Sequence, residues 1–256
     1  MYTTLRVLRD GPVLTVHLSR PEVHNAFDER LIAELTRVFS EVEGGVRVVI
    51  LTGDGPYFSA GADLNWMRRS VTYDHEHNLR DAEALLTMYR AIDECPRPVI
   101  ARVNGSAFGG AVGLIACADI AVAVDGAQFV FSEVKLGIVP AVIAPFVLRK
   151  IGPGQARRYF ASAETFDAAR ARELGLVHEV VSEAALNERV ETLTRAILGN
   201  GPEAIAAAKL LIRQIEALTT QAARDVTVAT IARLRTSAEG QEGLSAFLDK
   251  RKPSWS

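Results

Sequence analysis

This chain of 256 residues has little cysteine and no marked excess of charge of either sign. Its two cysteines, Cys95 and Cys117, have the spacing of neither a metal site nor a disulfide framework. It has 29 lysines and arginines against 31 aspartates and glutamates, and its isoelectric point is about 6.2. This balance argues against the basic surface of a nucleic-acid-binding protein, so we expect no nucleic-acid partner.

Long apolar runs are also missing. No run reaches the roughly 18–20 residues that a membrane-spanning helix needs, so we expect no membrane partner. The first residues show an alternating strand pattern rather than the charged and apolar regions of a signal peptide. With the low cysteine content, this predicts a cytoplasmic protein. Apolar residues make up 48% of the chain, which is enough for a sizeable core.

Strand and helix patterns alternate through the first 180 residues. Two strands are predicted within residues 3–18 around Asp10-Gly11, followed by a helix that Asp28 caps. Short apolar runs predict further strands at 46–51, 99–103, 119–124, 128–131 and 177–181. A polar helix is predicted over 65–93, and the chain after residue 141 is mostly helical in pattern. The sequence predicts an α/β fold with a helical C-terminal part.

The first candidate site is the segment FSAGADL at residues 58–64, which lies between a predicted strand and the polar helix. The small residues Ala60, Gly61 and Ala62 would let a ligand approach the main chain closely. The alternative is a tight strand-to-helix turn that Asp63 caps, and the spacing alone leaves both interpretations open.

The second candidate site is the segment AFGGAVGLI at residues 107–115. Gly109 and Gly110 would open a helix whose free N–H groups favour an anion or a developing oxyanion. A dinucleotide-binding fingerprint would need a glycine where Phe108 stands. A nucleophile elbow around Ser106 would need one where Asn104 stands. Glycines that merely allow close packing of a helix against a strand remain an alternative.

The third candidate is Glu133, directly after a predicted apolar strand. Apolar neighbours at Val134, Leu136 and Ile138 would partly remove its carboxylate from water. Burial raises the pKa of a carboxyl group and suits it to acid–base chemistry near neutral pH. A solvated glutamate at a strand end is the plain alternative.

Further short segments extend this pattern in order along the chain. They are SRPE at 19–22 with Asn25-Ala26, NG at 104–105, ADI at 118–120, AQF at 127–129, LG at 136–137 with Pro140, AE at 163–164 and LGLV at 174–177. With the three candidate sites they resemble the crotonase (enoyl-CoA hydratase/isomerase) superfamily over about residues 5–200. The local motifs are most similar to those of its methylglutaconyl-CoA hydratase-like members.

The resemblance implies a fold and an assembly. Residues 1–198 would form a spiral of ββα units that holds the acyl-CoA site. Residues 199–256 would form a helical region for oligomerisation, giving a homotrimer or a dimer of trimers.

The resemblance also implies the chemistry. The carbonyl of an acyl-CoA thioester would lie between the backbone N–H groups of Ala62 and Gly110, with Glu133 as acid and base. Coenzyme A would be part of the substrate, with no further cofactor and no metal. It would bind along the chain at Val23, Ala26, Ala60, Asp63 and Leu64.

Gly113 departs from the family pattern. Many hydratases of the family carry a second glutamate at this position, one helical turn beyond Gly110. Its absence leaves Glu133 as the only matched carboxylate and would leave room for a bulkier or branched acyl group. We favour hydration of a 2-enoyl-CoA, which could be branched like methylglutaconyl-CoA. The alternative is a 3-enoyl to 2-enoyl isomerase, which needs only one base.

Other interpretations stay open at this point. A non-catalytic acyl-CoA-binding protein is one, although an idle pocket would not need Glu133. A peptidase or esterase of similar fold would need a base beside Ser106, and no histidine partner can be assigned. The remaining candidates are Arg68, Arg69 or Arg80 for a distal carboxylate of the substrate, and Asp81 or Glu83 as a second acid.

Overall fold

The computed structural model describes residues 2–42, 44–216 and 218–255. They form two compact units, one from the described residues of 1–95 and 99–190, the other from those of 96–98 and 191–256. The division falls inside α7 (Glu183–Leu198), ahead of the boundary at residues 198–199 that the resemblance implies.

A six-stranded sheet runs through the first unit in the order β1-β2-β3-β5-β7-β10. Its strands are β1 (Leu5–Asp10), β2 (Val13–Leu18), β3 (Val48–Gly53), β5 (Val99–Val103), β7 (Ile120–Val124) and β10 (Glu179–Val181). The β1–β2 pair is an antiparallel hairpin, as predicted, and the other neighbours run parallel. The strands β3, β5 and β7 are apolar and almost wholly buried, as in parallel sheets covered on both faces.

A second sheet has four short strands in the order β4-β6-β8-β9. These are β4 (Tyr57–Ser59), β6 (Ser106–Phe108), β8 (Gln128–Val130) and β9 (Phe166–Asp167). The first three are parallel to one another, and β9 runs antiparallel to β8.

The same order of elements, two strands followed by a helix, repeats along the chain and builds both sheets. Strand β3 joins the first sheet, β4 joins the second, and helices α2 and α3 follow; β5, β6 and α4 repeat this order, as do β7, β8 and α5. The α/β class and the spiral of ββα units are thereby confirmed.

Helix α1 (Glu29–Ser40) forms as the sequence predicts. The Asp28 carboxylate accepts a hydrogen bond from the Leu31 N–H, and the apolar positions of one face are buried. The single helix predicted over 65–93 is wrong: the structure has α2 (Leu64–Ser70) and α3 (His75–Asp93). Both Asp63 and Asp74 act as N-caps, and the second cap starts a new helix where the pattern suggested continuation.

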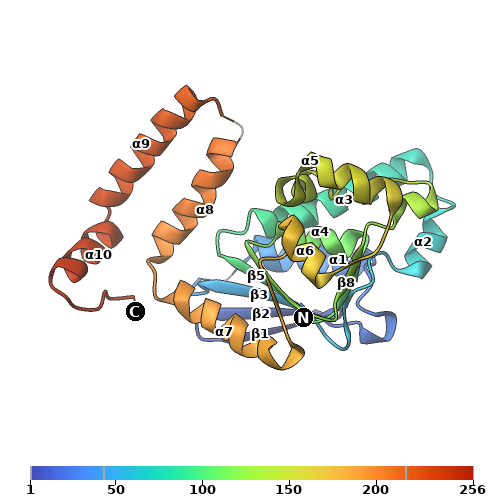
Figure 1. The fold of residues 1–256 in the computed structure, drawn as a ribbon, viewed down its shortest axis with the longest axis horizontal. Helices are drawn as coiled ribbons and strands as arrows, with labels where there is room; N and C mark the ends of the chain where they lie inside the picture. The colour runs from blue at the N-terminus through green and yellow to red at the C-terminus, as the bar shows by residue number, and fades with distance from the viewer. Residues whose placement is uncertain (1, 43, 217, 256) are drawn as a thin grey trace. The chain divides into compact units, whose positions relative to one another are not determined.

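Helix α4 (Gly110–Cys117) lies at the centre of the first unit, with α3 and α5 (Ala144–Ser162) packed against it. Residues 111–117 are all buried, which explains why this helix is apolar all round. Helix α5 bends at Gly152, whose φ is 72°, next to Pro153. Figure 1 shows α1, α3, α4 and α5 on one side of strands β1, β2 and β3. The short helix α6 (Ala168–Leu174) follows β9.

The second unit is helical, as predicted, with α8 (Pro202–Glu216), α9 (Thr220–Thr236) and α10 (Ala238–Leu248) drawn in orange to red in Figure 1. None of the described residues of α8 and α9 is buried, and α10 buries only Ala246. Apolar side chains of these helices are exposed instead, among them Ile212, Val228 and Phe247.

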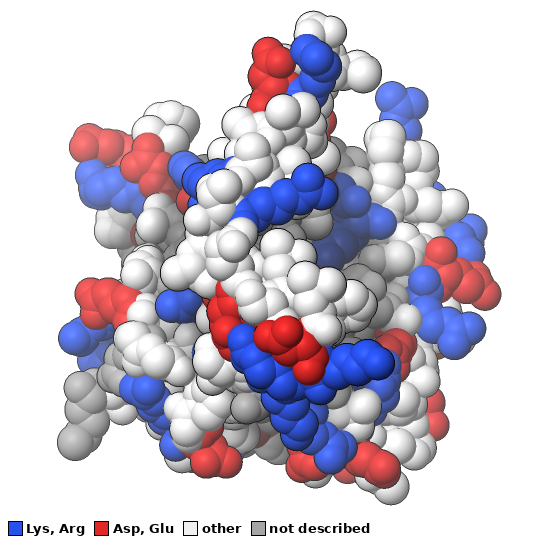
Figure 2. Space-filling model, turned by 90° about the vertical axis from the view of Figure 1, so that its left-hand side faces the viewer, with Lys and Arg blue, Asp and Glu red and all other residues white. Residues whose placement is uncertain are grey.

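The charged side chains are mixed in sign over the face drawn in Figure 2, where lysines and arginines lie beside aspartates and glutamates. This agrees with the formal net charge of -2. Within the part of the chain that the structure describes, no helix has the length and apolar character needed to span a membrane.

Candidate active site

Three parallel strands bring the three candidate sites to one edge of the smaller sheet. In the register, Ser59 of β4 pairs with Ala107 of β6, and Phe108 of β6 pairs with Val130 of β8. The first residues after these three neighbouring strands are Ala60, Gly109 and Phe131. Ala62, Gly110 and Glu133 each follow the end of their own strand by a few residues. Because the three parallel strands end at the same edge of the sheet, these residues lie at that edge.

The segments around Gly61 and Gly110 touch through their main chains. Gly61 has a φ of +84°, which favours glycine. A Cβ atom at Gly61 would lie 2.5 Å from the Phe108 carbonyl oxygen and 3.7 Å from the Gly110 nitrogen. Any side chain at residue 61 would therefore push the two segments apart, which is the physical reason for a glycine between Ala60 and Ala62.

The N–H groups of Ala62 and Gly110 are available to a ligand. The flanking groups are used: the Phe27 N–H donates to the Gly61 oxygen at 2.6 Å, and the Asp63 N–H donates to the Phe27 oxygen at 2.8 Å. Among the described residues, no hydrogen bond uses the N–H of Ala62 or that of Gly110. Gly110 is the first residue of α4, where helix geometry leaves N–H groups free and the dipole favours negative charge.

The Glu133 carboxylate lies beside the segment that carries the Gly110 donor. Gly109 has a φ of +52°, and a Cβ atom there would lie 3.4 Å from Glu133 Oε1, so the carboxylate lies over the residue before Gly110. Glu133 Oε2 is buried and has no hydrogen-bond partner among the described residues. Burial raises the pKa of Glu133, and a backbone hydrogen bond offsets this only in part. A buried carboxylate oxygen left without a partner is costly, which points to a chemical role.

Gly113 does not open the space that the sequence led us to expect, and that expectation is wrong. A Cβ atom at Gly113 would collide with Ile143 Cγ2 and lie 2.9 Å from Tyr89 Cε1. Ile143, from the turn before α5, and Tyr89, from α3, fill the place of the missing side chain. Neither residue was picked out from the sequence, because both reach Gly113 from distant segments.

The residues named for coenzyme A lie on two adjoining segments. The Ala60 N–H donates to the His24 oxygen at 2.9 Å, and Phe27 forms a parallel bridge with Ala62. Val23 ends a 3₁₀ turn, η1 (Pro21–Val23), with Ala26 buried beyond it, while Leu64 is 69% exposed. The structure thus brings Val23, Ala26, Ala60, Asp63 and Leu64 together.

Within this group the Asp63 side chain is already engaged. It caps α2 by accepting from the N–H groups of Asn65 and Trp66, and it pairs with Arg20 Nη2 at 3.0 Å. The turn interpretation of this segment and the ligand interpretation both hold geometrically, because the cap uses the Asp63 side chain while the Ala62 N–H stays free.

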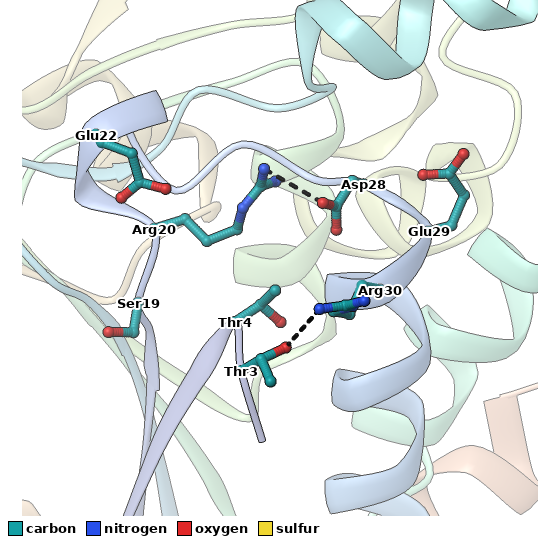
Figure 3. A pocket seen from close by; sticks show the side chains of 8 residues that line it. All are labelled: Thr3, Thr4, Ser19, Arg20, Glu22, Asp28, Glu29 and Arg30. Atoms are coloured by element: carbon teal, nitrogen blue, oxygen red, sulfur yellow. Dashed lines mark hydrogen bonds and ion pairs between the residues drawn. The ribbon is translucent and has the colours of Figure 1, made fainter. Parts of the chain in front are cut away.

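A separate pocket of about 510 Å³ lies between residues 3–4, 19–22 and 28–30 (Figure 3). Its lining includes Arg20, which pairs with Asp28, and Arg30, which donates to Thr3. It contains none of Val23, Ala26, Ala60, Asp63 and Leu64, although Ser19, Arg20 and Glu22 belong to the SRPE segment of the family pattern. The complete lining is Thr3, Thr4, Ser19, Arg20, Glu22, Asp28, Glu29 and Arg30.

The weaker candidates have other partners. Arg68 donates to Asn65, Arg69 pairs with Glu29, and Arg80 pairs with Glu76, all on the exposed surface. Asp81 accepts from the Trp66 indole at 3.2 Å. Glu83 is exposed on α3. Among the described residues, no group of three or more His, Cys, Asp or Glu side chains is arranged to hold a metal ion.

Comparison with known proteins agrees with this geometry. The family described as enoyl-CoA hydratase/isomerase matches residues 9–256. The chain belongs to this family of enzymes. It is similar to the crystal structure of an enoyl-CoA hydratase from Shewanella pealeana, with 43% identity and a TM-score of 0.95 over 99% of this chain and 96% of that one.

Two further similar proteins match nearly the whole chain. The structure of Pseudomonas aeruginosa AtuE is 36% identical, with a TM-score of 0.96 over 99% of both chains. The 2,3-dehydroadipyl-CoA hydratase of Escherichia coli K12 is 31% identical over 98% of both chains. These likenesses confirm the superfamily and the fold that the sequence motifs predicted.

Proposed function

We propose that this enzyme adds water across the C2–C3 double bond of a 2-enoyl-CoA thioester. The observation that carries the proposal is the partly buried Glu133 carboxylate near the free N–H groups of Ala62 and Gly110. Its Oε2 has no hydrogen-bond partner among the described residues. Together they offer one group that moves protons and two that stabilise an oxyanion, which is what this addition needs.

In the proposed reaction, the thioester carbonyl oxygen accepts hydrogen bonds from the N–H groups of Ala62 and Gly110. Glu133 takes a proton from a water molecule as the water oxygen bonds to C3. The electrons of the double bond move toward the carbonyl, giving an enolate whose oxygen the two N–H groups stabilise. The proton then passes from Glu133 to C2, which gives the 3-hydroxyacyl-CoA and restores the carboxylate.

Coenzyme A would lie along the two adjoining segments that contain Val23, Ala26, Ala60, Asp63 and Leu64. Support comes from the small or exposed residues there and from the Asp63 cap, which fixes the turn next to Ala62. No cofactor beyond the substrate's own coenzyme A is needed for this chemistry.

We propose an acyl group that is apolar near the reacting carbons. The turn that contains Glu133 continues into exposed Leu136, Ile138 and Val139, and the Ile138 N–H donates to the main-chain carbonyl oxygen of Glu133 at 3.3 Å. These side chains could contact an acyl chain close to the carboxylate. Since Ile143 and Tyr89 fill the space at Gly113, a branched acyl group such as methylglutaconyl would have to lie elsewhere in the pocket.

The isomerase alternative rests on one observation, the lack of a second carboxylate at Gly113. An isomerase moves a proton between C2 and C4 and needs a single base. Hydration is favoured because several similar proteins carry hydratase names and because the local motifs resemble methylglutaconyl-CoA hydratases.

Oligomerisation and location complete the proposal. We propose that α8, α9 and α10 form the contact region of a homotrimer or a dimer of trimers, supported by their exposed apolar side chains. Sedimentation of the purified chain would measure this, and a monomer at micromolar concentration would contradict it. We propose a cytoplasmic location, which the low cysteine content supports.

The test is a substrate panel read by mass spectrometry. Purified protein is incubated with 2-enoyl-CoA and 3-enoyl-CoA thioesters, methylglutaconyl-CoA among them, in ordinary and heavy-oxygen water. We expect 2-enoyl substrates to gain one water molecule that carries the heavy isotope. Conversion of 3-enoyl to 2-enoyl substrate without water addition would favour the isomerase, and binding without any turnover would contradict both enzymes.

A further inference from the structure

Tyr89 is a buried residue that the proposed reaction does not use. It lies next to Gly110, which carries one of the proposed oxyanion donors. It lies on α3 and is 1% exposed. Its hydroxyl donates to the Gly110 carbonyl oxygen at 2.8 Å. Its ring approaches Gly113 from the same side, so Tyr89 lies along the whole first turn of α4.

We propose that Tyr89 is a positioning residue that holds the Gly110 carbonyl and so fixes the first turn of α4 for thioester binding. The inference rests on the proposed function, because it needs the Gly110 N–H to be an oxyanion donor. It names a residue that acts through the main chain rather than by touching the reacting atoms.

The first turn of α4 needs such support. The two residues that open it, Gly109 and Gly110, have no side chains to restrict the backbone, and Gly109 has a φ of +52°. Among the described residues, no side chain caps this helix. A donor that must meet a developing oxyanion acts best when its direction is fixed in advance. The Tyr89 hydrogen bond supplies this restraint from a neighbouring helix.

Tyr89 is itself held firmly. The centroid of its ring lies 5.9 Å from that of the Phe146 ring, and its hydroxyl would lie 2.7 Å from a Cβ atom at Gly110. A larger residue at position 110 would displace the hydroxyl, so the glycine and the tyrosine fit each other.

The hydroxyl acts as a donor and not as a base. Burial, together with the nearby Cys117 and Glu133, raises the pKa of Tyr89 well above its ordinary value of 10.0. The phenol therefore stays neutral at physiological pH and keeps its proton for the Gly110 carbonyl.

Tyr159 offers a matched control in the same unit. It is also buried, at 2% exposed, and its hydroxyl accepts a hydrogen bond from Arg170 Nε at 2.9 Å. The centroid of its ring lies 4.6 Å from that of the Phe166 ring, among residues that take no part in the proposed reaction. Tyr159→Phe therefore removes a buried hydroxyl without touching the first turn of α4.

The experiment compares Tyr89→Phe with Tyr159→Phe in the full-length protein. We expect Tyr89→Phe to lower kcat for 2-enoyl-CoA hydration about tenfold, the effect of one ordinary hydrogen bond, with KM nearly unchanged. We also expect bound 3-oxoacyl-CoA, which the N–H pair would hold as its ultraviolet-absorbing enolate, to ionise at higher pH in Tyr89→Phe. Tyr159→Phe should leave both measurements at wild-type values.

Equal kcat and equal enolate ionisation in Tyr89→Phe and wild type would overturn the inference alone, because the wild type would still be a working hydratase. A lower melting temperature with unchanged kcat and ionisation would mean a merely structural role and would overturn it as well. A wild-type protein that neither hydrates any 2-enoyl-CoA nor ionises bound 3-oxoacyl-CoA would overturn the proposed function together with the inference.

Discussion

The chain uses two carboxylates at the ends of neighbouring segments in opposite ways. Asp63 is 4% exposed, and its oxygens accept from two backbone N–H groups and from Arg20. Although burial acts to raise the pKa of Asp63, these donors lower it overall. Glu133 has a buried oxygen without a partner among the described residues, and burial raises its pKa.

The two carboxylates therefore have different roles: Asp63 supports the local structure, and Glu133 serves the proposed chemistry. At Asp63 the folded protein stabilises the charged form and gains a fixed turn next to Ala62. At Glu133 it leaves one buried carboxylate oxygen without a partner among the described residues, and it gains a proton acceptor that is partly shielded from water. Each of the following changes tests one side of this comparison.

Asp63→Ala should have the largest effect on stability. It removes the cap of α2 and leaves the largely buried Arg20 without one of its two acidic partners. We expect the free energy of unfolding to fall by about 2–4 kcal/mol at pH 7 in chemical denaturation. Because the pKa of Asp63 is lower in the folded state, the loss should be full above its ordinary pKa of 3.8 and fade as the pH falls below it.

Glu41→Ala is the control for Asp63→Ala. Glu41 pairs with Arg37 on the surface, where both side chains are exposed. We expect a change of less than about 0.5 kcal/mol. An Asp63→Ala protein as stable as Glu41→Ala would show that the cap and the Arg20 pair do not support this segment.

Gly113→Ala tests whether Tyr89 and Ile143 close the site of the missing carboxylate. The added methyl group would collide with Ile143 and lie within 3 Å of the Tyr89 ring. We expect a loss of about 1–3 kcal/mol in the free energy of unfolding, as for an overpacked core.

Gly154→Ala is the control for Gly113→Ala, because the expected change in the free energy of unfolding has the opposite sign. Gly154 lies in α5, and a Cβ atom there meets nothing within 4 Å. We expect this change to stabilise the protein by about 0.5–1 kcal/mol, because alanine loses less backbone entropy in a helix. Equal melting temperatures for the two variants would mean that the space at Gly113 is open after all.

Glu133→Gln should change stability less than Asp63→Ala does, and in the favourable direction. A neutral amide avoids the cost of a buried charge, so we expect the free energy of unfolding to rise by about 1 kcal/mol at pH 8. Since the pKa of Glu133 is higher in the folded state, wild-type stability falls relative to the variant as the pH rises from 4.5 through the raised pKa. At lower pH the two proteins should converge, and a variant less stable than wild type at pH 8 would contradict this account.

Much of this site follows from local sequence. The alternation of short apolar runs with small-residue turns predicts the strands, and each of the three candidate segments directly follows one of them. The free N–H of Gly110 is implied by glycines at a helix start, and the partial burial of Glu133 by its apolar neighbours. The registers of β4, β6 and β8 then bring the three segments together, as the resemblance implies.

The rest depends on contacts between distant segments. Nothing around Gly113 in the sequence shows that Tyr89 and Ile143 fill the space beside it, so an open pocket was expected. The hydrogen bond from Tyr89 to Gly110 joins two helices that no local pattern relates. Asp74 starts a new helix inside what the apolar spacing suggests is one, because a cap competes with continuation of the helix.

The most direct test of the central role of Glu133 is to measure turnover and acyl-CoA binding side by side in wild type and Glu133→Gln. We expect hydration by Glu133→Gln to fall by about 10²–10⁴-fold. The dissociation constant for a saturated acyl-CoA should stay close to that of wild type, because the Ala62 and Gly110 donors are intact. Near-normal turnover in Glu133→Gln would contradict the account.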